Sequence, residues 1–381
     1  MEGNRYRLAK QVGRVDSKWI ELSDSEENRF EKIIRGMCKV SLHDHTIVFP
    51  EDPNNYIEFA GSGEWLIGLE GLSRAGLDAV FEGLMDGICL ARSRDPWSWD
   101  NIVYQLGLIN WLVDKLECIF IGRSADDIVK AHEEDRLAIY IHLEGAPHLG
   151  EELELVRHLY GFGVRCMGIV YSVGNEYGSG LADEKDYGLT PLGAELVDKM
   201  NSIGIAIDLA HANDLTCLEV MEVSSKPVFI THAGARGVWP SRRMKPDEVL
   251  ERLADNGGVI GIEASPHTTL SKEHPYHSIE SVMDHFKYIE DLIGLDHLAF
   301  GPDTLFGDHV ALHRVFRDYL SIRASRSGSP NYIEVPYVDG LENPGDFPNI
   351  IRWLIRNGYS DNEIEKIVFR NIHRVLKHTI G

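Results

Sequence analysis

Six residues of the types that bind metal ions each follow a short apolar stretch of the chain. They are His43, His45, Glu144, His211, His232 and Asp303. Neutral imidazoles suit zinc or a similar divalent ion, and one carboxylate can bridge two such ions about 3.5–4 Å apart. Water bound to such ions has its pKa lowered towards about 7. Asp303, beside that water, could accept its proton and pass it to a leaving group. The set therefore suits hydrolysis of a C–N or C–O bond without a covalent enzyme intermediate.

Taken singly, each of these residues has a simpler explanation. A buried histidine is more often a hydrogen-bonded core residue than a ligand, and Glu144 or Asp303 alone could cap a helix. The chain has 17 histidines, so the pair His43-x-His45 could arise by chance, although alternate residues of a strand do face the same way. One site at the ends of five strands explains the pattern better than six separate accidents.

His211 and His232 indicate which elements would position such a site. Each histidine ends a short apolar run, at 207–211 and 229–232, and the segment 213–226 between the runs has the length of a helix. In a parallel β/α barrel the C-terminal ends of the strands open onto one face, and that face carries the chemistry. The two histidines are therefore predicted to point into one pocket.

The same alternation of strand and helix recurs along the chain. Eight segments are predicted as strands: 39–43, 76–83, 137–143, 164–170, 207–211, 229–232, 257–262 and 297–301. Thr190 before Pro191 predicts a helix start, with threonine as the N-cap. No Rossmann glycine fingerprint follows the first strand. The count predicts an α/β protein with a single (β/α)8 TIM-type barrel rather than an open doubly wound sheet.

The rest of the chain divides around this barrel. Residues 1–35 are polar and are predicted as an N-terminal extension, and residues 36–381 as the metallohydrolase barrel domain. Prolines and glycines predict a loop at 50–70. The long mixed segment 306–344, a loop after strand 8, is expected to lie over the active-site mouth.

Composition excludes several classes of function. The net charge of −22 argues against nucleic acid and anionic membrane surfaces as partners. Five scattered cysteines without a CxxC pattern indicate reduced thiols and a cytoplasmic protein. The N-terminus lacks the apolar region of a signal peptide, and no run of about 18 apolar residues is present, so no membrane span is expected.

Several ordered motifs resemble one known family, the membrane (renal) dipeptidase family of zinc dipeptidases, within the amidohydrolase-type barrels. The matching segments are EG at 144–145, LTPLG at 189–193, MNSIG at 200–204, DLAH at 208–211, PVFITH at 227–232, SRRMKPD at 241–247, NGGV at 256–259 and GPD at 301–303. The resemblance runs from about residue 43 to residue 374. It implies a metal-dependent dipeptidase with a small-molecule substrate, a dipeptide or similar.

The resemblance also implies roles for single residues. His43 would bind one metal ion, Glu144 would bridge two, and His211 and His232 would bind the second. Asp303 would be the general base and acid. Arg243 would meet the C-terminal carboxylate of the substrate, a common use of a guanidinium group. The cofactor would be Zn²⁺, two ions per chain. A homodimer is expected from the resemblance alone, and the membrane anchor of the family is not expected here.

Two positions depart from the family pattern. The family has His-x-Asp on the first strand, where this chain has His43-Asp44-His45. His45 can still bind a metal ion, but the site loses a negative charge, and Asp44 is expected to point away. Tyr171 stands where the family places a histidine that contacts the substrate carbonyl, and a tyrosine hydroxyl donates a hydrogen bond from a different height.

These departures leave three functions open. The first is a binuclear dipeptidase, which Arg243 supports. The second is a related metallohydrolase on another small amide or ester, favoured by His45 and Tyr171. The third is a barrel without catalysis that serves assembly or ligand capture, and the presence of Asp303 with the whole metal-type set argues against it.

Overall fold

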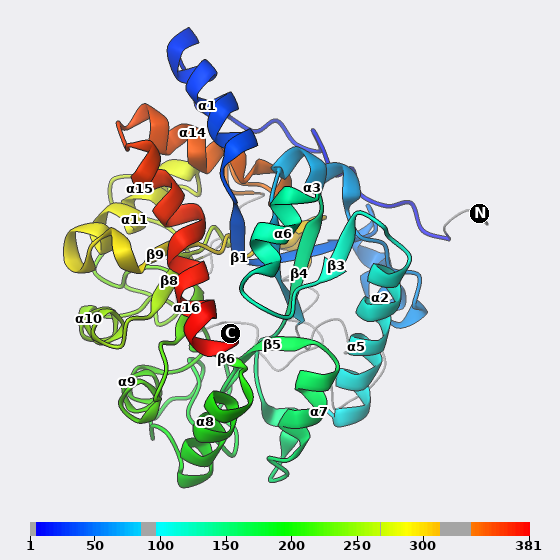
Figure 1. Cartoon of the computed structure of the whole chain (residues 1–381), viewed down its shortest axis with the longest axis vertical. Coiled ribbons are helices and arrows are strands. Elements are labelled where there is room, and N and C mark those ends of the chain that lie inside the picture. The colour runs from blue at the N-terminus through cyan, green and yellow to red at the C-terminus, as the bar shows by residue number, and fades with distance from the viewer. Residues whose placement is uncertain (1–4, 85–96, 267, 313–336) are drawn as a thin grey trace.

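Ten parallel strands form the central sheet of the computed structural model, which describes residues 5–84, 97–266, 268–312 and 337–381 (Figure 1). The strands are β1 (Val40–Val48), β2 (Ala79–Leu84), β3 (Ile119–Ile121), β4 (Leu137–Leu143), β5 (Val164–Gly168), β6 (Ala206–Asp208), β7 (Phe229–Ala233), β8 (Val259–Ile262), β9 (Leu298–Phe300) and β10 (Leu305–Phe306). Their order in the sheet is β10-β1-β2-β4-β5-β6-β7-β8-β9, and β3 pairs with β4 beside this path.

The sheet closes on itself because the segment after β9 runs beside β1. The amide of Asp303 donates to the carbonyl of His43 over 3.0 Å, and the amide of His45 donates to the carbonyl of Thr304 over 2.9 Å. β10 then pairs in parallel with the end of β1. The result is the predicted (β/α)8 barrel of the TIM type, with the C-terminal ends of its strands at one mouth.

A bulge in β1 decides which of its side chains face the barrel interior. Ser41 pairs with Val80 and Asp44 pairs with Glu82, so β1 advances three residues where β2 advances two. A bulge of this kind places two consecutive residues opposite one residue of the partner and re-aims the side chains that follow. Val40 faces the barrel interior. Strict alternation from Val40 would therefore turn residues 43 and 45 outward, but after the bulge His43 and His45 face inward.

Aromatic side chains fill the barrel below the mouth. Phe81 of β2 stacks on Tyr140 of β4, with ring centroids 5.1 Å apart, and meets Phe229 of β7 across the barrel at 5.8 Å. All three rings are fully buried. Burial of one such side chain stabilises the fold by roughly 1.5–3 kcal/mol, so this layer is a packed floor for the site above it.

Helices surround the sheet. Their bounds are α1 (Asp24–Gly36), α2 (Tyr56–Ser62), α3 (Leu69–Ala75), α5 (Trp99–Asp114), α6 (Asp127–Glu133), α7 (Leu155–Gly161), α8 (Pro191–Ile203), α9 (Asp214–Val223), α10 (Asp247–Asp255), α11 (Ile279–Ile293), α14 (Pro348–Arg356), α15 (Asp361–Glu365) and α16 (Asn371–Thr379), the last two joined by a π-helical turn at Lys366–Arg370. As predicted, Thr190 caps α8, where its Oγ1 accepts from the amide of Gly193 over 3.0 Å. Within the described ranges, no helix is both long and apolar enough to cross a bilayer.

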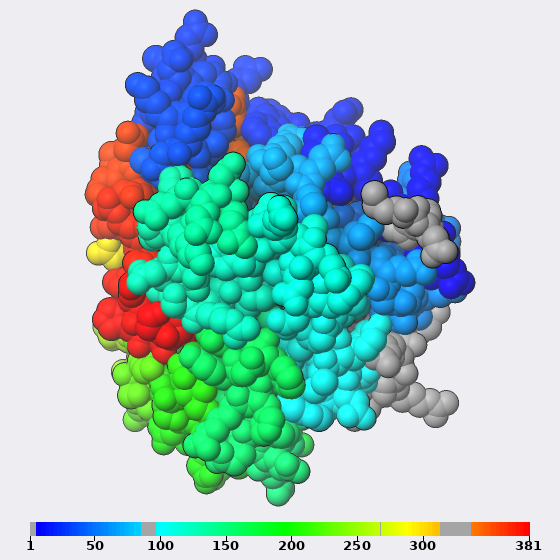
Figure 2. Space-filling model, turned by 45° about the vertical axis from the view of Figure 1, so that its right-hand side comes forward, coloured from blue at the N-terminus to red at the C-terminus, as the bar shows by residue number. Residues whose placement is uncertain are grey.

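The N-terminal segment packs on the outside of the barrel. α1 begins with a capping box between Ser23 and Glu26 and buries Phe30 and Ile33. Glu27 of α1 pairs with Arg352 of α14 at 2.5 Å. The space-filling view shows α1 projecting at the top of the molecule, with the orange C-terminal helices beside its base (Figure 2). The boundary between an extension at 1–35 and a barrel domain at 36–381 stays a prediction.

Some predicted elements differ from those of the structure, and one predicted loop lies largely outside its described residues. The loop predicted at 50–70 is wrong for much of its length, because Tyr56, Phe59 and Ala60 are buried at helical spacing in α2. Its proline and glycine mark element ends instead: Pro53 starts a 3₁₀ turn (Pro53–Asn55), and Gly63, with φ of 73°, ends α2. The short strands β3 and β10 were not predicted. Residues 313–336 of the segment predicted to cover the mouth lie outside the described residues.

Candidate metal centre

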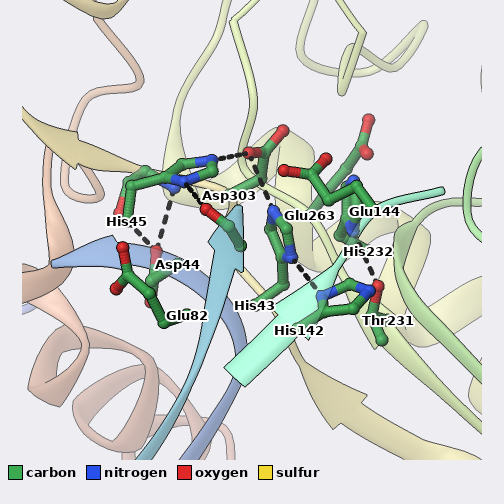
Figure 3. Close-up of polar contacts among 12 residues, drawn as sticks. His43, Asp44, His45, Glu82, His142, Glu144, Thr231, His232, Glu263 and Asp303 are labelled. Carbon is green, nitrogen blue, oxygen red and sulfur yellow. Dashed lines mark hydrogen bonds and ion pairs between the residues drawn. The ribbon is translucent and has the colours of Figure 1, made fainter. Parts of the chain in front are cut away.

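The six metal-type residues predicted from the sequence meet at the mouth of the barrel. His43 and His45 lie on β1, His232 lies on β7, and Glu144, His211 and Asp303 follow β4, β6 and β9. Their ligand atoms form three overlapping groups, each with atoms within 4.8 Å of one another: His43–His232–Asp303, His43–His45–Glu144 and Glu144–His211–His232. Figure 3 shows five of the six converging from their strands. The sequence thus predicted which residues come together.

The pKa values of the two histidines of β1 are shifted in opposite directions. Burial lowers the pKa of His43 to about 4, so this imidazole is neutral at neutral pH. Burial also lowers the pKa of His45, but the carboxylates of Asp303 and Glu144 outweigh it and raise the value to about 9. Nδ1 of His45 donates to the carbonyl of Gly83 over 2.9 Å, which leaves Nε2 facing Asp303. A positive charge, from a proton or a metal ion, is stabilised at this end of the site.

Gly83 leaves room for three of the candidate ligands, His43, His45 and Glu144. A Cβ atom at this position of β2 would lie 3.0 Å or less from the rings of His43 and His45 and from the carboxylate of Glu144. Such approaches require a neighbour to move, and all three neighbours are buried. The absence of a side chain on β2 is therefore what allows β1 and β4 to bring their ligands together.

His211 and His232 form the opposite side of the site with Glu144. Their Nε2 atoms are 3.1 Å apart, and Nε2 of His211 is 3.3 Å from Oε2 of Glu144. The other ring nitrogens are held by hydroxyls: Nδ1 of His211 contacts Ser172 at 3.1 Å, and Nδ1 of His232 contacts Thr231 at 2.8 Å. Burial holds the pKa of both histidines well below the usual range. Both rings are therefore neutral, and their Nε2 atoms face each other beside the carboxylate of Glu144.

Asp303 lies against the β1 histidines. Its Oδ1 is 3.4 Å from Nε2 of His43 and 3.3 Å from Nε2 of His45. Burial raises its pKa, but the contacts with these two histidines outweigh burial and hold the pKa well below the usual range. The residue has φ of 58°, a left-handed conformation that aspartate tolerates better than most residues. Asp303 is thus an ionised carboxylate held over the ligand cluster.

Arg243 lies beside the site, and its positive charge is paired with the carboxylate of Glu263. Its side chain is 3% exposed and lies 2.6 Å from Oε2 of Glu263, the residue after β8. The guanidinium also donates to the carbonyls of Ala210 and His232, over 2.9 and 2.7 Å. These bonds hold the backbone directly before His211 and at His232 itself. Binding of a substrate carboxylate by Arg243 stays a prediction, since Glu263 occupies part of its donor set.

Comparison with protein families gives a match over most of the chain. The model described as membrane dipeptidase (Peptidase family M19) matches residues 91–313 and 328–380. The chain belongs to the membrane dipeptidase family. The structure shows the barrel and the cluster of metal-type residues that the resemblance in the sequence implied.

Individual relatives of this family are distant in sequence. Dipeptidase tcpJ of Claviceps purpurea is 29% identical over 294 residues, which are 77% of this chain and 61% of that protein. Human dipeptidase 3 is 24% identical over 311 residues, 79% of this chain and 57% of that protein. The chain thus spans about three fifths of the length of the curated relatives it matches.

Solved structures share the fold. An amidohydrolase from Pseudomonas aeruginosa aligns with a TM-score of 0.76 and 22% identity, covering 92% of this chain and 99% of that one. A metallo peptidase from Rhodobacter sphaeroides, liganded with a phosphinate mimic of the dipeptide L-Ala-D-Ala, aligns with a TM-score of 0.70 and 18% identity, covering 90% and 99%. At these identities the likeness concerns the fold.

Tyr171, predicted to stand at the position of a family histidine, lies in the loop after β5. Its ring lies on His211, with centroids 4.4 Å apart, and on Trp97 at 5.4 Å. The next residue, Ser172, has φ of 53° and contacts His211 through its hydroxyl. The tyrosine is therefore beside the second pair of ligands, on the side predicted for substrate contact.

Several buried polar residues around the site were not predicted from the sequence. They are Glu82, His142, Thr231 and Glu263, to which no role was given. His142 lies near the end of β4, two residues before Glu144, so alternation could have placed both side chains on the inner face. Asp44 points away from the cluster as expected, because its carboxylate accepts from Ser41 and Thr304. The partner of Glu82 is the amide of Thr46 at 2.7 Å.

The donor set fits a divalent metal ion. Nε2 of His43 is buried and makes no well-directed hydrogen bond in the described part of the chain, although it faces the ligand cluster. Imidazole and carboxylate donors together suit zinc and similar ions. Glu144 belongs both to the group with His43 and His45 and to the group with His211 and His232, so its position suits a bridging ligand.

Proposed function

We propose that this protein is a metal-dependent dipeptidase that hydrolyses the peptide bond of dipeptides. The observation that supports it most is the convergence of four histidines, Glu144 and Asp303 at the mouth of the barrel. Membership of the membrane dipeptidase family supports the substrate class. The names of the curated relatives, dipeptidases from fungi and mammals, agree with this reading.

We further propose two Zn²⁺ ions per chain. His43 and His45 would hold the first, His211 and His232 the second, and Glu144 both. When bound, such ions supply Lewis acidity for the carbonyl group and activate water. Four imidazoles with one bridging carboxylate carry less negative charge than a set with two carboxylates, so the first ion is expected to bind more weakly than the second.

The protein's own part in the reaction is positioning and proton transfer. Asp303 is ionised at neutral pH and can accept a proton from water at Oδ1, then donate it to the leaving amine. Ser172 and Thr231 fix the rings of His211 and His232. Tyr171 lies at the edge of this set, where its hydroxyl could contact a substrate.

The decisive test is turnover of a dipeptide panel by zinc-loaded protein, followed by mass spectrometry. Cleavage of at least some dipeptides is expected, with a loss of about 10²–10⁴-fold in kcat for Asp303→Asn. Metal content of both proteins is measured alongside, because Asp303 is within 3.4 Å of two ligands. If fully loaded wild-type protein cleaves no dipeptide, the proposed activity is wrong.

A reducing location such as the cytoplasm is also proposed. The cysteines that the structure describes, Cys38, Cys118, Cys166 and Cys217, are free thiols, which agrees with a reducing compartment. Fractionation of the source cells with an antibody against the chain would test this. Recovery only from an oxidising compartment would contradict it.

A further inference from the structure

We propose that Asp208 and His142 fix the tautomer of His43, so that Nε2 of His43 presents its lone pair to the candidate metal site. This inference rests on the proposed metal site but not on the proposed substrate. His142 and Asp208 are positioning residues in this account. Together with His43 they form a line of three buried side chains from β6 through β4 to β1.

The line begins at Asp208, the last residue of β6, which is 1% exposed. Its Oδ1 accepts from the amides of Ala210 and Thr231, over 3.1 and 2.8 Å. Its Oδ2 lies 3.3 Å from Nε2 of His142. Both of these last two atoms are buried and make no well-directed hydrogen bond among the described residues, so the 3.3 Å ion-pair contact between them is the interaction on which the line depends. An ionised carboxylate only accepts, so the proton between them belongs to Nε2 of His142.

The second link follows from the chemistry of a neutral imidazole. A ring that carries its proton on Nε2 has a lone pair on Nδ1. Nδ1 of His142 lies 3.2 Å from Nδ1 of His43, and the rings are nearly perpendicular at 81° (Figure 3). Two lone pairs would repel at this distance, so His43 must carry its proton on Nδ1. Its Nε2, which lies 3.4 Å from Oδ1 of Asp303, is then without a proton and can bind a metal ion.

The alternative is that His142 and Asp208 only pack in the barrel core as a buried polar pair. In that case the direction of proton donation between Asp208, His142 and His43 would not affect metal binding. If the pair instead sets the tautomer of His43, the direction of donation matters. Reversing it in both contacts, Asp208–His142 and His142–His43, would put a proton on Nε2 of His43, which could then no longer bind a metal ion. A substitution that reverses direction without changing shape therefore separates the two accounts.

Asp208→Asn is such a substitution. The amide oxygen can keep the bonds from Ala210 and Thr231, while the NH₂ group faces Nε2 of His142 and reverses the line. We expect zinc affinity, measured by competition with a chromophoric chelator, to fall about 10–100-fold, the size usual for partners of metal ligands. In ¹⁵N-imidazole-labelled, metal-free protein, His43 should change from the Nδ1–H form to the Nε2–H form.

The matched control is the same substitution in a His142→Phe background. Phenylalanine fills a similar volume but carries no proton between Asp208 and His43, so Asp208→Asn should then have no further effect on zinc affinity.

An equal loss in both backgrounds would overturn the proposal, and so would an unchanged affinity and tautomer in the single variant. Should Asp208→Asn fail to fold, the NMR spectrum of the wild-type protein still decides, since an Nε2–H form of His43 would contradict the proposal. None of these readouts requires a substrate, so they stay valid if the dipeptidase activity is wrong.

Discussion

Two charged residues beside the site, Arg243 and Lys245, hold nearby backbone in place. Arg243 pairs with Glu263 at 2.6 Å, and both are buried. Burial raises the pKa of Glu263, and Arg243 is the main opposing influence. Lys245, also buried, donates to the carbonyl of Ala212 over 2.7 Å. Two cations from one loop thus hold the backbone on either side of His211.

The Arg243–Glu263 pair predicts strong coupling between two substitutions. Arg243→Met leaves a buried carboxylate without its cation and should cost about 3–5 kcal/mol of unfolding free energy. Glu263→Gln added to it removes the unpaired charge, so the double variant should be markedly more stable than the sum of single effects. Urea unfolding of the four proteins measures the coupling. Additive losses would show that the pair contributes no mutual stabilisation.

For single residues, the sequence predicted which side chains gather at the site, but it did not predict the buried partners that contact them. His43, His45, Glu144, His211, His232 and Asp303 were recognisable because ligand-type side chains follow predicted strands. His142 and Glu263 have the same chemistry, yet their roles depend on distances between different strands. Such distances depend on barrel closure and strand register, which no local pattern of side chains specifies.

Among the elements, β1 departs furthest from its predicted form. The sequence predicted a strand ending at residue 43, whereas β1 continues to Val48. Its bulge puts Leu42 and His43 on the same side of the strand, which breaks the period of two on which strand prediction relies. By contrast, the predicted start of α8 is confirmed, because the N-cap Thr190 is a local feature of the sequence.

The start of α8 gives a prediction at the same scale. Oγ1 of Thr190 accepts from the amide of Gly193 and donates to the carbonyl of Glu176, over 3.0 and 2.6 Å. Thr190→Ala should therefore lower the unfolding free energy by about 1–2 kcal/mol. Thr190→Ser, which keeps both bonds, is the control and should stay within about 0.5 kcal/mol of wild type. Urea midpoints at constant m-value report both; equal midpoints for alanine and wild type would refute the cap's contribution.

For the whole molecule, buried neutral histidines make stability depend on pH. His285 on α11 accepts from the amide of Ala235 at Nδ1 over 2.9 Å and donates to the carbonyl of Leu270 over 2.8 Å. Burial lowers its pKa to about 4. The unfolded chain, with a histidine pKa near 6.5, binds more protons between these values, so the stability from His285 is present above about pH 6.5 and falls as pH falls towards 4.

This reasoning predicts the size of one pH effect. Between pH 7 and pH 4.5 the contribution of His285 should fall by about 2.5 kcal/mol. His285→Gln keeps an acceptor and a donor but does not titrate, so its loss of stability over that interval should be smaller than that of wild type. Urea unfolding at both pH values makes the comparison. Identical losses in the two proteins would mean that His285 does not protonate on unfolding.

Closure of the barrel beside β1 also has a consequence during synthesis. His45 and Asp303 touch in the finished fold but are 258 residues apart in the chain. At translation rates of about 5–20 residues per second, the histidines of β1 emerge at least about ten seconds before Asp303 does. A nascent chain can therefore offer metal-binding imidazoles long before it carries its proton acceptor. The proposed hydrolysis begins only once the ribosome has passed β9, so the arrangement delays activity until the barrel can close.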